Sequence, residues 1–193
     1  MQVFLRGHLW VEKHLRDLLA AYLADPAAIN LDRMTFSQKV SLAQALGAVS
    51  EDEAVPLRTL NKIRNRMAHD LTGEPAEQEI ASLESSLGGR HGKVLTALSN
   101  HVDPGNDITK RFEYVIIALL QHLEFETIQQ RYRRKHKSAL DIYYLLCAID
   151  EDMGRDVDPE AHREKQGLPP FPVPSDVLLP PYGTGVPDPE RGT

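Results

Sequence analysis

The chain has 193 residues, of which 41% are hydrophobic and 26% charged, and its formal net charge is −6 at pH 7. This length fits one ordinary domain with a packed core, and the composition is that of a globular rather than a disordered protein. The single cysteine, Cys147, excludes an internal disulfide and any zinc site that needs paired thiolates. No apolar stretch approaches the ~20 residues of a membrane span, and no secretory leader is recognisable, so we expect a cytoplasmic protein without membrane contact.

Apolar residues recur at helical spacing through residues 3–24, which predicts a long first helix ending before Asp25. Thr35, followed three residues later by Gln38, has the pattern of a helix start in which each side chain satisfies the other's backbone amide. The second helix is predicted to run from this point to about Gly47, because glycine suits the terminating left-handed position.

A third helix is predicted with Pro56 in its first turn and with Ile63 and Met67 on its buried face. Residues 75–87 and 93–101 predict two shorter helices separated by glycines.

The strongest helical pattern begins at Asp107 or Thr109 and continues through Ile128 towards a basic run, and a last apolar helix is predicted for residues 138–152. Alternating β-branched patterns typical of strands are absent. The expected fold is all-α, a bundle of four to five main helices formed by residues 1–154.

Residues 155–193 differ in character, because nine of the 13 prolines lie between Pro159 and Pro189. Proline lacks an amide donor and disfavours helix interiors and sheets, so this tail is predicted to be extended or disordered. Its apolar residues leave open the alternative that it lies along a groove of the bundle or of a partner.

Motifs for common cofactors and nucleophiles do not fit. Gly92-Lys93 is followed by Val94, where a phosphate-binding loop needs Ser or Thr. His8 and Glu12 belong to no His-Glu-x-x-His pattern and are more simply a same-face helical pair. No Gly-x-Ser-x-Gly elbow is present. We therefore expect neither a metal nor another cofactor.

The segment Arg64-Asn65-Arg66-Met67-Ala68-His69 lies near the end of the third predicted helix. Asn65 and His69 are four residues apart and share a helix face, whereas Arg64 and His69 diverge by ~140°. Histidine exchanges protons near neutrality, arginine pairs with phosphate and asparagine orients either group. These groups suffice for metal-independent RNA cleavage, in which the ribose 2′-hydroxyl attacks its own phosphate and leaves a cyclic phosphate and a 5′-hydroxyl. Arg64 would stabilise the transition state.

Two acid-free basic clusters stand out against the negative total charge. The first comprises Arg58, Lys62, Arg64 and Arg66, of which Arg58, Lys62 and Arg66 are the candidate RNA-binding residues. The second lies beyond the strongest helical pattern and comprises Arg131, Arg133, Arg134, Lys135 and Lys137. Such runs are most often only solvated helix faces.

Arg64-Asn65-x-x-x-His69 resembles the Arg-x(4–6)-His motif of the HEPN superfamily, in which a polar residue, often Asn, follows the arginine. The resemblance implies a four- or five-helix bundle with the motif near the end of one helix. It also implies ribonuclease activity, as in toxin–antitoxin, abortive-infection and CRISPR-linked systems. The expected assembly is a homodimer in which the motifs of two subunits meet in one cleft.

The flanking segments Phe4-Leu5-Arg6-Gly7-His8-Leu9, Phe36-Ser37-Gln38-Lys39 and Leu60-Asn61-Lys62-Ile63 are more similar to a branch of short bacterial proteins related to the mannitol-operon repressor. This resemblance covers about the first half of the chain. It implies an alternative function, a non-catalytic regulator that binds a protein or nucleic acid.

Two functions of different class thus remain. The first is a dimeric metal-independent endoribonuclease, a toxin or defence effector held in check by an antitoxin or other regulatory protein; the second is the regulator. A purely structural interpretation also stands, in which His69 complements the helix dipole, Asn65 caps backbone groups and Arg64 pairs with Glu51 or Glu53.

Overall fold

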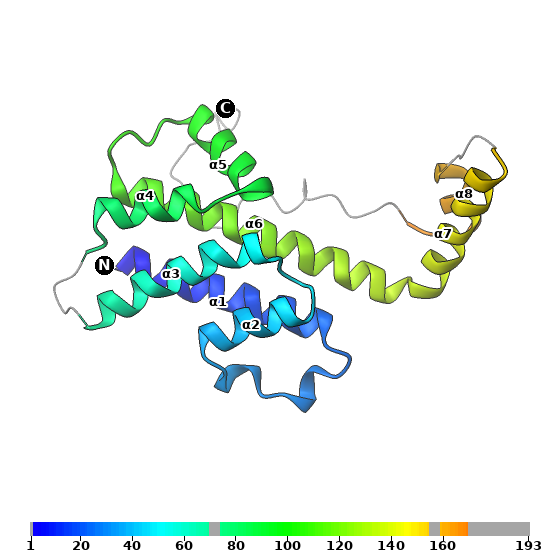
Figure 1. Cartoon of the computed structure of the whole chain (residues 1–193), viewed down its shortest axis with the longest axis horizontal. Helices are drawn as coiled ribbons and strands as arrows, with labels where there is room; N and C mark the ends of the chain where they lie inside the picture. Colours follow the sequence, from blue (N-terminus) through cyan, green and yellow to red (C-terminus); the bar gives the residue numbers. More distant parts are fainter. Residues whose placement is uncertain (1, 70–73, 155–158, 170–193) are drawn as a thin grey trace, which may run out of the picture.

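The computed structural model describes residues 2–69, 74–154 and 159–169, and over these residues the chain is all-helical, with no strand (Figure 1). The elements are α1 (Gln2–Tyr22), η1 (Pro26–Ala28), η2 (Leu31–Arg33), α2 (Phe36–Ala45), α3 (Glu51–His69), α4 (Glu77–Ser85), α5 (Gly89–His101), α6 (Ile108–Lys135), α7 (Lys137–Asp152) and α8 (Pro159–Lys165). Among the described helices, none combines the length and apolar character that a bilayer crossing requires.

The main core lies between α1 and α6, which pack along each other, with α2 and α3 against α1 and with α4 and α5 against α6. Leu15, Leu57 and Leu119 are among its fully buried side chains. Gly7 permits the close approach of α1 to α6, since a Cβ built on it would lie 2.9 Å from both Phe112 Cε1 and Ile116 Cγ1. The bundle thus places the start of α1 against the first half of α6.

The first two predicted helices are confirmed within two residues. α1 ends at Tyr22, and α2 begins after Thr35, whose Oγ1 accepts a hydrogen bond from the Gln38 amide at 3.3 Å. In return, Gln38 Oε1 accepts from the Thr35 amide at 2.8 Å. Gly47 has φ +69°, the left-handed conformation expected of a residue that ends a helix.

The predicted start of the third helix is wrong, because α3 begins at Glu51, well before Pro56. Ser50 Oγ accepts from the Glu53 amide at 3.3 Å, and Glu53 Oε2 accepts from the Ser50 amide at 2.8 Å. This reciprocal cap supplies a first turn ahead of the proline. The two shorter helices are confirmed, although α5 begins at Gly89 rather than at Lys93.

The strongest predicted helix is α6, capped by Asp107 and extended to Lys135, so that it includes all of the basic run except Lys137. The prediction of a last helix is confirmed as α7, but α7 does not complete the main bundle. Figure 1 shows α7 and α8 at the far end of α6, away from α1 to α5. Their small separate core contains Tyr132, Leu140 and Leu168. Because α6 runs past the end of α1, no bundle helix is available to cover α7, and several of its apolar residues are exposed: Ile142, Leu145 and Ile149.

The prediction of an extended tail is wrong for Pro159–Lys165, which form α8. Proline is compatible with a first helical position, and the Glu, Ala, Arg and Lys residues that follow are good helix formers. Tyr132 Oη donates a hydrogen bond to Pro169 O at 2.6 Å, and this bond ties the end of the described chain to α6. The rest of the predicted tail, residues 170–193, lies outside the described residues.

Candidate functional site on α3

The predicted catalytic residues occupy the last two turns of α3. Ile63 and Met67 are buried as predicted, while Arg64, Asn65 and His69 are exposed. The aliphatic face therefore anchors the helix to the core, and the polar face is available to a ligand.

Arg64 and Asn65 contact each other directly, since Arg64 Nη1 donates a hydrogen bond to Asn65 Oδ1 at 3.2 Å. His69 is the last residue of α3 and makes no hydrogen bond or ion pair with either of them in the described residues. Within one chain, Arg64 and Asn65 are therefore in direct contact, whereas His69 lies about one helical turn away. This separation agrees with the divergence that helical geometry predicts.

The expected pairing of Arg64 with Glu51 or Glu53 is wrong. Glu51 instead pairs with Arg58, and Glu53 lies 3.1 Å from His122. Even the nearer of the two acids is separated from Arg64 by ~16 Å of helix rise, which explains why the predicted pair does not form. Arg64 therefore keeps its charge at the surface, with Asn65 as its hydrogen-bond partner.

The three predicted RNA-binding residues differ in their surroundings. Arg58 Nη1 lies 2.7 Å from Glu51 Oε1. Arg66 binds the two carboxylate oxygens of Glu79, with Nε–Oε1 2.6 Å and Nη2–Oε2 2.5 Å. Lys62 is exposed, and no acid of the described residues pairs with it. Two of the three cations are thus largely neutralised inside the chain, and Lys62 is the one whose charge remains beside Arg64.

A buried ion pair lies behind the motif and was not predicted. Lys39 is only 3% exposed, and its Nζ donates to Glu12 Oε1 at 2.7 Å. The sequence pattern groups Glu12 with His8 and does not reveal its partner on α2. A signal was present, because Lys39 lies within the buried stripe of α2, next to Val40 and one turn after Phe36.

His8 is buried next to this ion pair and lines a small hollow together with Arg64. Burial lowers its pKa, and the positive charges of Arg64 and Lys39 act in the same direction. Its Nε2 atom has no hydrogen-bond partner. His8 is therefore a neutral imidazole at neutral pH, in contact with the inner side of the candidate site.

A second unpredicted cluster joins α3, α5 and α6. The rings of His91 and His122 are buried with centroids 4.4 Å apart, and His122 Nε2 lies 3.1 Å from Glu53 Oε1. Burial lowers the pKa of both histidines, that of His91 to about 4. Their spacing in the sequence gives no indication of this contact, which depends on how the helices pack.

The α3 site therefore presents the exposed guanidinium of Arg64, held by the amide of Asn65, and the imidazole of His69 at the end of the helix. Such groups bind an anionic oxygen and transfer a proton. Over the described residues, no three His, Cys, Asp or Glu side chains converge to hold a metal ion. The chain has no match among family models, curated proteins or solved structures.

Proposed function

We propose that this chain is a metal-independent endoribonuclease of the HEPN type. The observation that carries the proposal is the exposed, hydrogen-bonded pair of Arg64 and Asn65, with His69 at the end of the same helix. Ile63 and Met67 fix the backbone under these side chains, so the polar groups are held on a rigid element.

In this proposal His69 takes the proton of the ribose 2′-hydroxyl, and the resulting oxygen attacks the adjacent phosphorus. The bond to the 5′-oxygen of the next nucleotide breaks and that oxygen takes up a proton from solvent, which gives a 2′,3′-cyclic phosphate and a 5′-hydroxyl. Arg64 binds the non-bridging oxygens as negative charge accumulates on them, and Asn65 orients its guanidinium.

The divergence of Arg64 and His69 on one helix is resolved in a homodimer, where Arg64 of one subunit faces His69 of the other. The surface beside the motif suits such an interface. Leu5 lines the same hollow as Arg64, and Leu9, one turn further along the same face of α1, is 62% exposed. Exposed apolar side chains next to a polar site are typical of an interaction surface.

A second function is favoured by a different observation. Arg58 and Arg66 are engaged by Glu51 and Glu79, so the motif face offers less free positive charge than its sequence suggests. A non-catalytic regulator, similar to the mannitol-operon repressor, needs no phosphate-binding groups at this face. In that case the apolar residues of α1 would bind a protein partner.

The deciding experiment is cleavage of a mixed RNA pool in EDTA. Arg64→Ala and His69→Ala are compared with the matched variants Arg33→Ala and His101→Ala, which remove an exposed arginine and an exposed histidine elsewhere. We expect cyclic-phosphate ends from the wild type and both control variants, and at least a hundredfold less product from the two motif variants. Equal cleavage by all five folded proteins would point to a contaminating nuclease. No cleavage by any of them would favour the regulator.

A further inference from the structure

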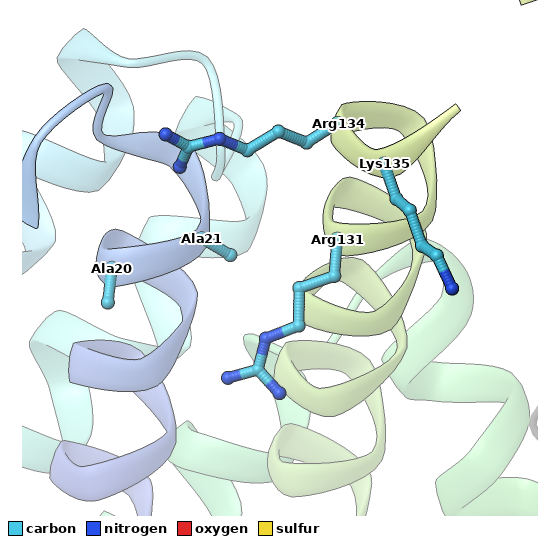
Figure 2. Close-up of a pocket in the computed structure, with 5 residues that line it drawn as sticks. All are labelled: Ala20, Ala21, Arg131, Arg134 and Lys135. Atoms are coloured by element: carbon cyan, nitrogen blue, oxygen red, sulfur yellow. The ribbon is translucent and has the colours of Figure 1, made fainter. Parts of the chain in front are cut away.

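A basic cleft lies at the opposite end of the bundle from the α3 motif. It occupies about 340 Å³ between the last turns of α1 and α6 and is lined by Ala20, Ala21, Arg131, Arg134 and Lys135. Figure 2 shows that the three cationic side chains come from α6 and the two alanines from α1; Arg131 and Arg134 extend towards α1, whereas Lys135 extends away from it.

Arg134 has a structural role in this cleft. Its Nη1 donates to Leu23 O at 2.8 Å, and its Nη2 donates to Ala24 O at 2.6 Å. These carbonyls lie beyond the last turn of α1, where a helix has no internal donors left. The arginine therefore links the ends of the two helices at the cleft.

Arg131 and Lys135 have no such role. They are four residues apart on one face of α6, both are exposed, and neither takes part in a hydrogen bond or ion pair within the described residues. No acid is among the residues that line the cleft, and two acids near the end of α1 in the sequence have partners there: Asp17 pairs with Lys13, and Asp25 accepts from the Ala27 amide. Two uncompensated cations thus belong to the lining of the cleft, in a chain whose net charge is −6.

The helix dipole explains part of this basic cluster, because cations complement the carboxyl end of α6. It does not explain why Arg131, a full turn before the end, shares a cleft with Lys135 and faces a wall of methyl groups. A peptide ligand would need hydrogen-bonding groups or a pocket for its side chains, and alanine side chains provide neither. The cleft therefore selects by charge, and the guanidinium of Arg131 and the ammonium of Lys135 can each bind oxygens of a phosphate backbone.

We propose that this cleft binds the phosphate backbone of single-stranded RNA, at a distance from the α3 motif. The inference rests on the proposed ribonuclease function and deepens it, since it assigns a second contact with the same substrate. Arg64 lines a hollow together with Phe112, near the start of α6, and Arg131 follows ~28 Å further along that helix. At ~3.4 Å per stacked nucleotide, roughly eight nucleotides would span the two sites.

The test measures binding separately from cleavage. A 2′-O-methyl RNA of about sixteen nucleotides, which spans both sites but lacks the attacking hydroxyl, is titrated with full-length protein and followed by fluorescence anisotropy. Arg131→Ala/Lys135→Ala is compared with Arg33→Ala/Lys93→Ala, a control that removes one exposed arginine and one exposed lysine elsewhere. Circular dichroism verifies that both variants are folded.

We expect the cleft variant to bind at least tenfold more weakly than the wild type, with a log–log salt slope shallower by about 1.4, and the control to bind within twofold of the wild type. Equal weakening in both variants, or wild-type affinity in the cleft variant, would overturn the inference. Competition by poly-glutamate as effective as that by unlabelled RNA would also overturn it, because the cleft would then take acidic protein. A cleft-dependent affinity for RNA in a protein that never cleaves unmodified RNA would refute the proposed function alone.

Discussion

The imidazole rings of His91 in α5 and His122 in α6 face each other inside the bundle, with centroids 4.4 Å apart and ring planes inclined at 69°. His91 is 3% exposed, and Glu53 Oε1 lies 3.1 Å from Nε2 of His122. Neither ring nitrogen of His122 makes an aligned hydrogen bond. α5 is thus held to the bundle partly by two neutral imidazoles, and this arrangement makes its packing sensitive to acid.

The first prediction follows from the lowered pKa of His91. Burial shifts this pKa from an ordinary 6.5 to about 4, so between these values the unfolded chain binds more protons than the folded one. The free energy of unfolding is therefore highest above pH 6.5 and falls as the pH drops towards 4. For His91 alone the loss from pH 7.5 to pH 5 is about 2 kcal/mol. Urea unfolding at the two pH values measures it.

The matched variants for this experiment are His91→Phe and His101→Phe. Phenylalanine at position 91 keeps a ring beside His122 but cannot be protonated, so this variant should lose most of the acid sensitivity that His91 contributes. His101 is exposed, and its replacement should leave the wild-type pH dependence unchanged. An unaltered pH dependence in His91→Phe would show that another group controls the acid response.

The helices of the bundle show which parts of the fold the sequence predicts. Periodicity and capping patterns predicted α1, α2 and α6 because their signals are local: an apolar stripe, Thr35 with Gln38, and Asp107. The start of α3 was predicted wrongly because Pro56 favours a first-turn position, whereas the Ser50 cap begins the helix earlier. The position of α7 outside the bundle depends on where α6 passes the end of α1, which no local pattern records.

The second prediction concerns the buried pair of Lys39 and Glu12, whose Nζ–Oε1 distance is 2.7 Å. Glu12→Leu leaves a cation in an interior position that is 3% exposed, and we expect a loss of about 3 kcal/mol in the free energy of unfolding. Lys39→Met in the same chain removes that cation, so the double variant should recover most of the loss. Urea unfolding of the four proteins gives the coupling energy. Additive losses would show that the two side chains do not interact.

The third prediction tests the close packing of α1 on α6. A Cβ on Gly7 would lie 2.9 Å from both Phe112 Cε1 and Ile116 Cγ1, and neither side chain has room to withdraw from the core. Gly7→Ala gains ~1 kcal/mol in helix propensity but forces the two helices apart. We expect a net loss of about 1–2 kcal/mol, measured by urea unfolding. Adding Ile116→Ala should then cost less than it does in the wild type, because the new methyl group partly fills the space. A stabilised Gly7→Ala variant would contradict the tight contact.

The candidate site was predictable only in part, because local sequence patterns do not record how the helices pack against one another. Helical spacing placed Ile63 in the core and Arg64 at the surface, and both positions are confirmed. The engagement of Arg66 by Glu79 could not be predicted, because α4 follows a connection whose path the sequence does not specify. The burial of His8 behind Arg64 likewise required the packing of α1 on α3.

The last prediction concerns the expected homodimer and rests on the proposed function. If Arg64 of one subunit works with His69 of the other, a mixed dimer of the Arg64→Ala and His69→Ala variants contains one intact site and one doubly defective site. Mixing the two inactive variants in equal amounts, under conditions where subunits exchange, should then restore about a quarter of wild-type cleavage, since half of the dimers are mixed and each carries one working site. The measurement is initial rate at equal total protein, with each variant alone as the control. Light scattering must first show that the protein is dimeric and that its subunits exchange. If the mixture is then as inactive as its components, each site uses Arg64 and His69 from the same chain or needs all four residues.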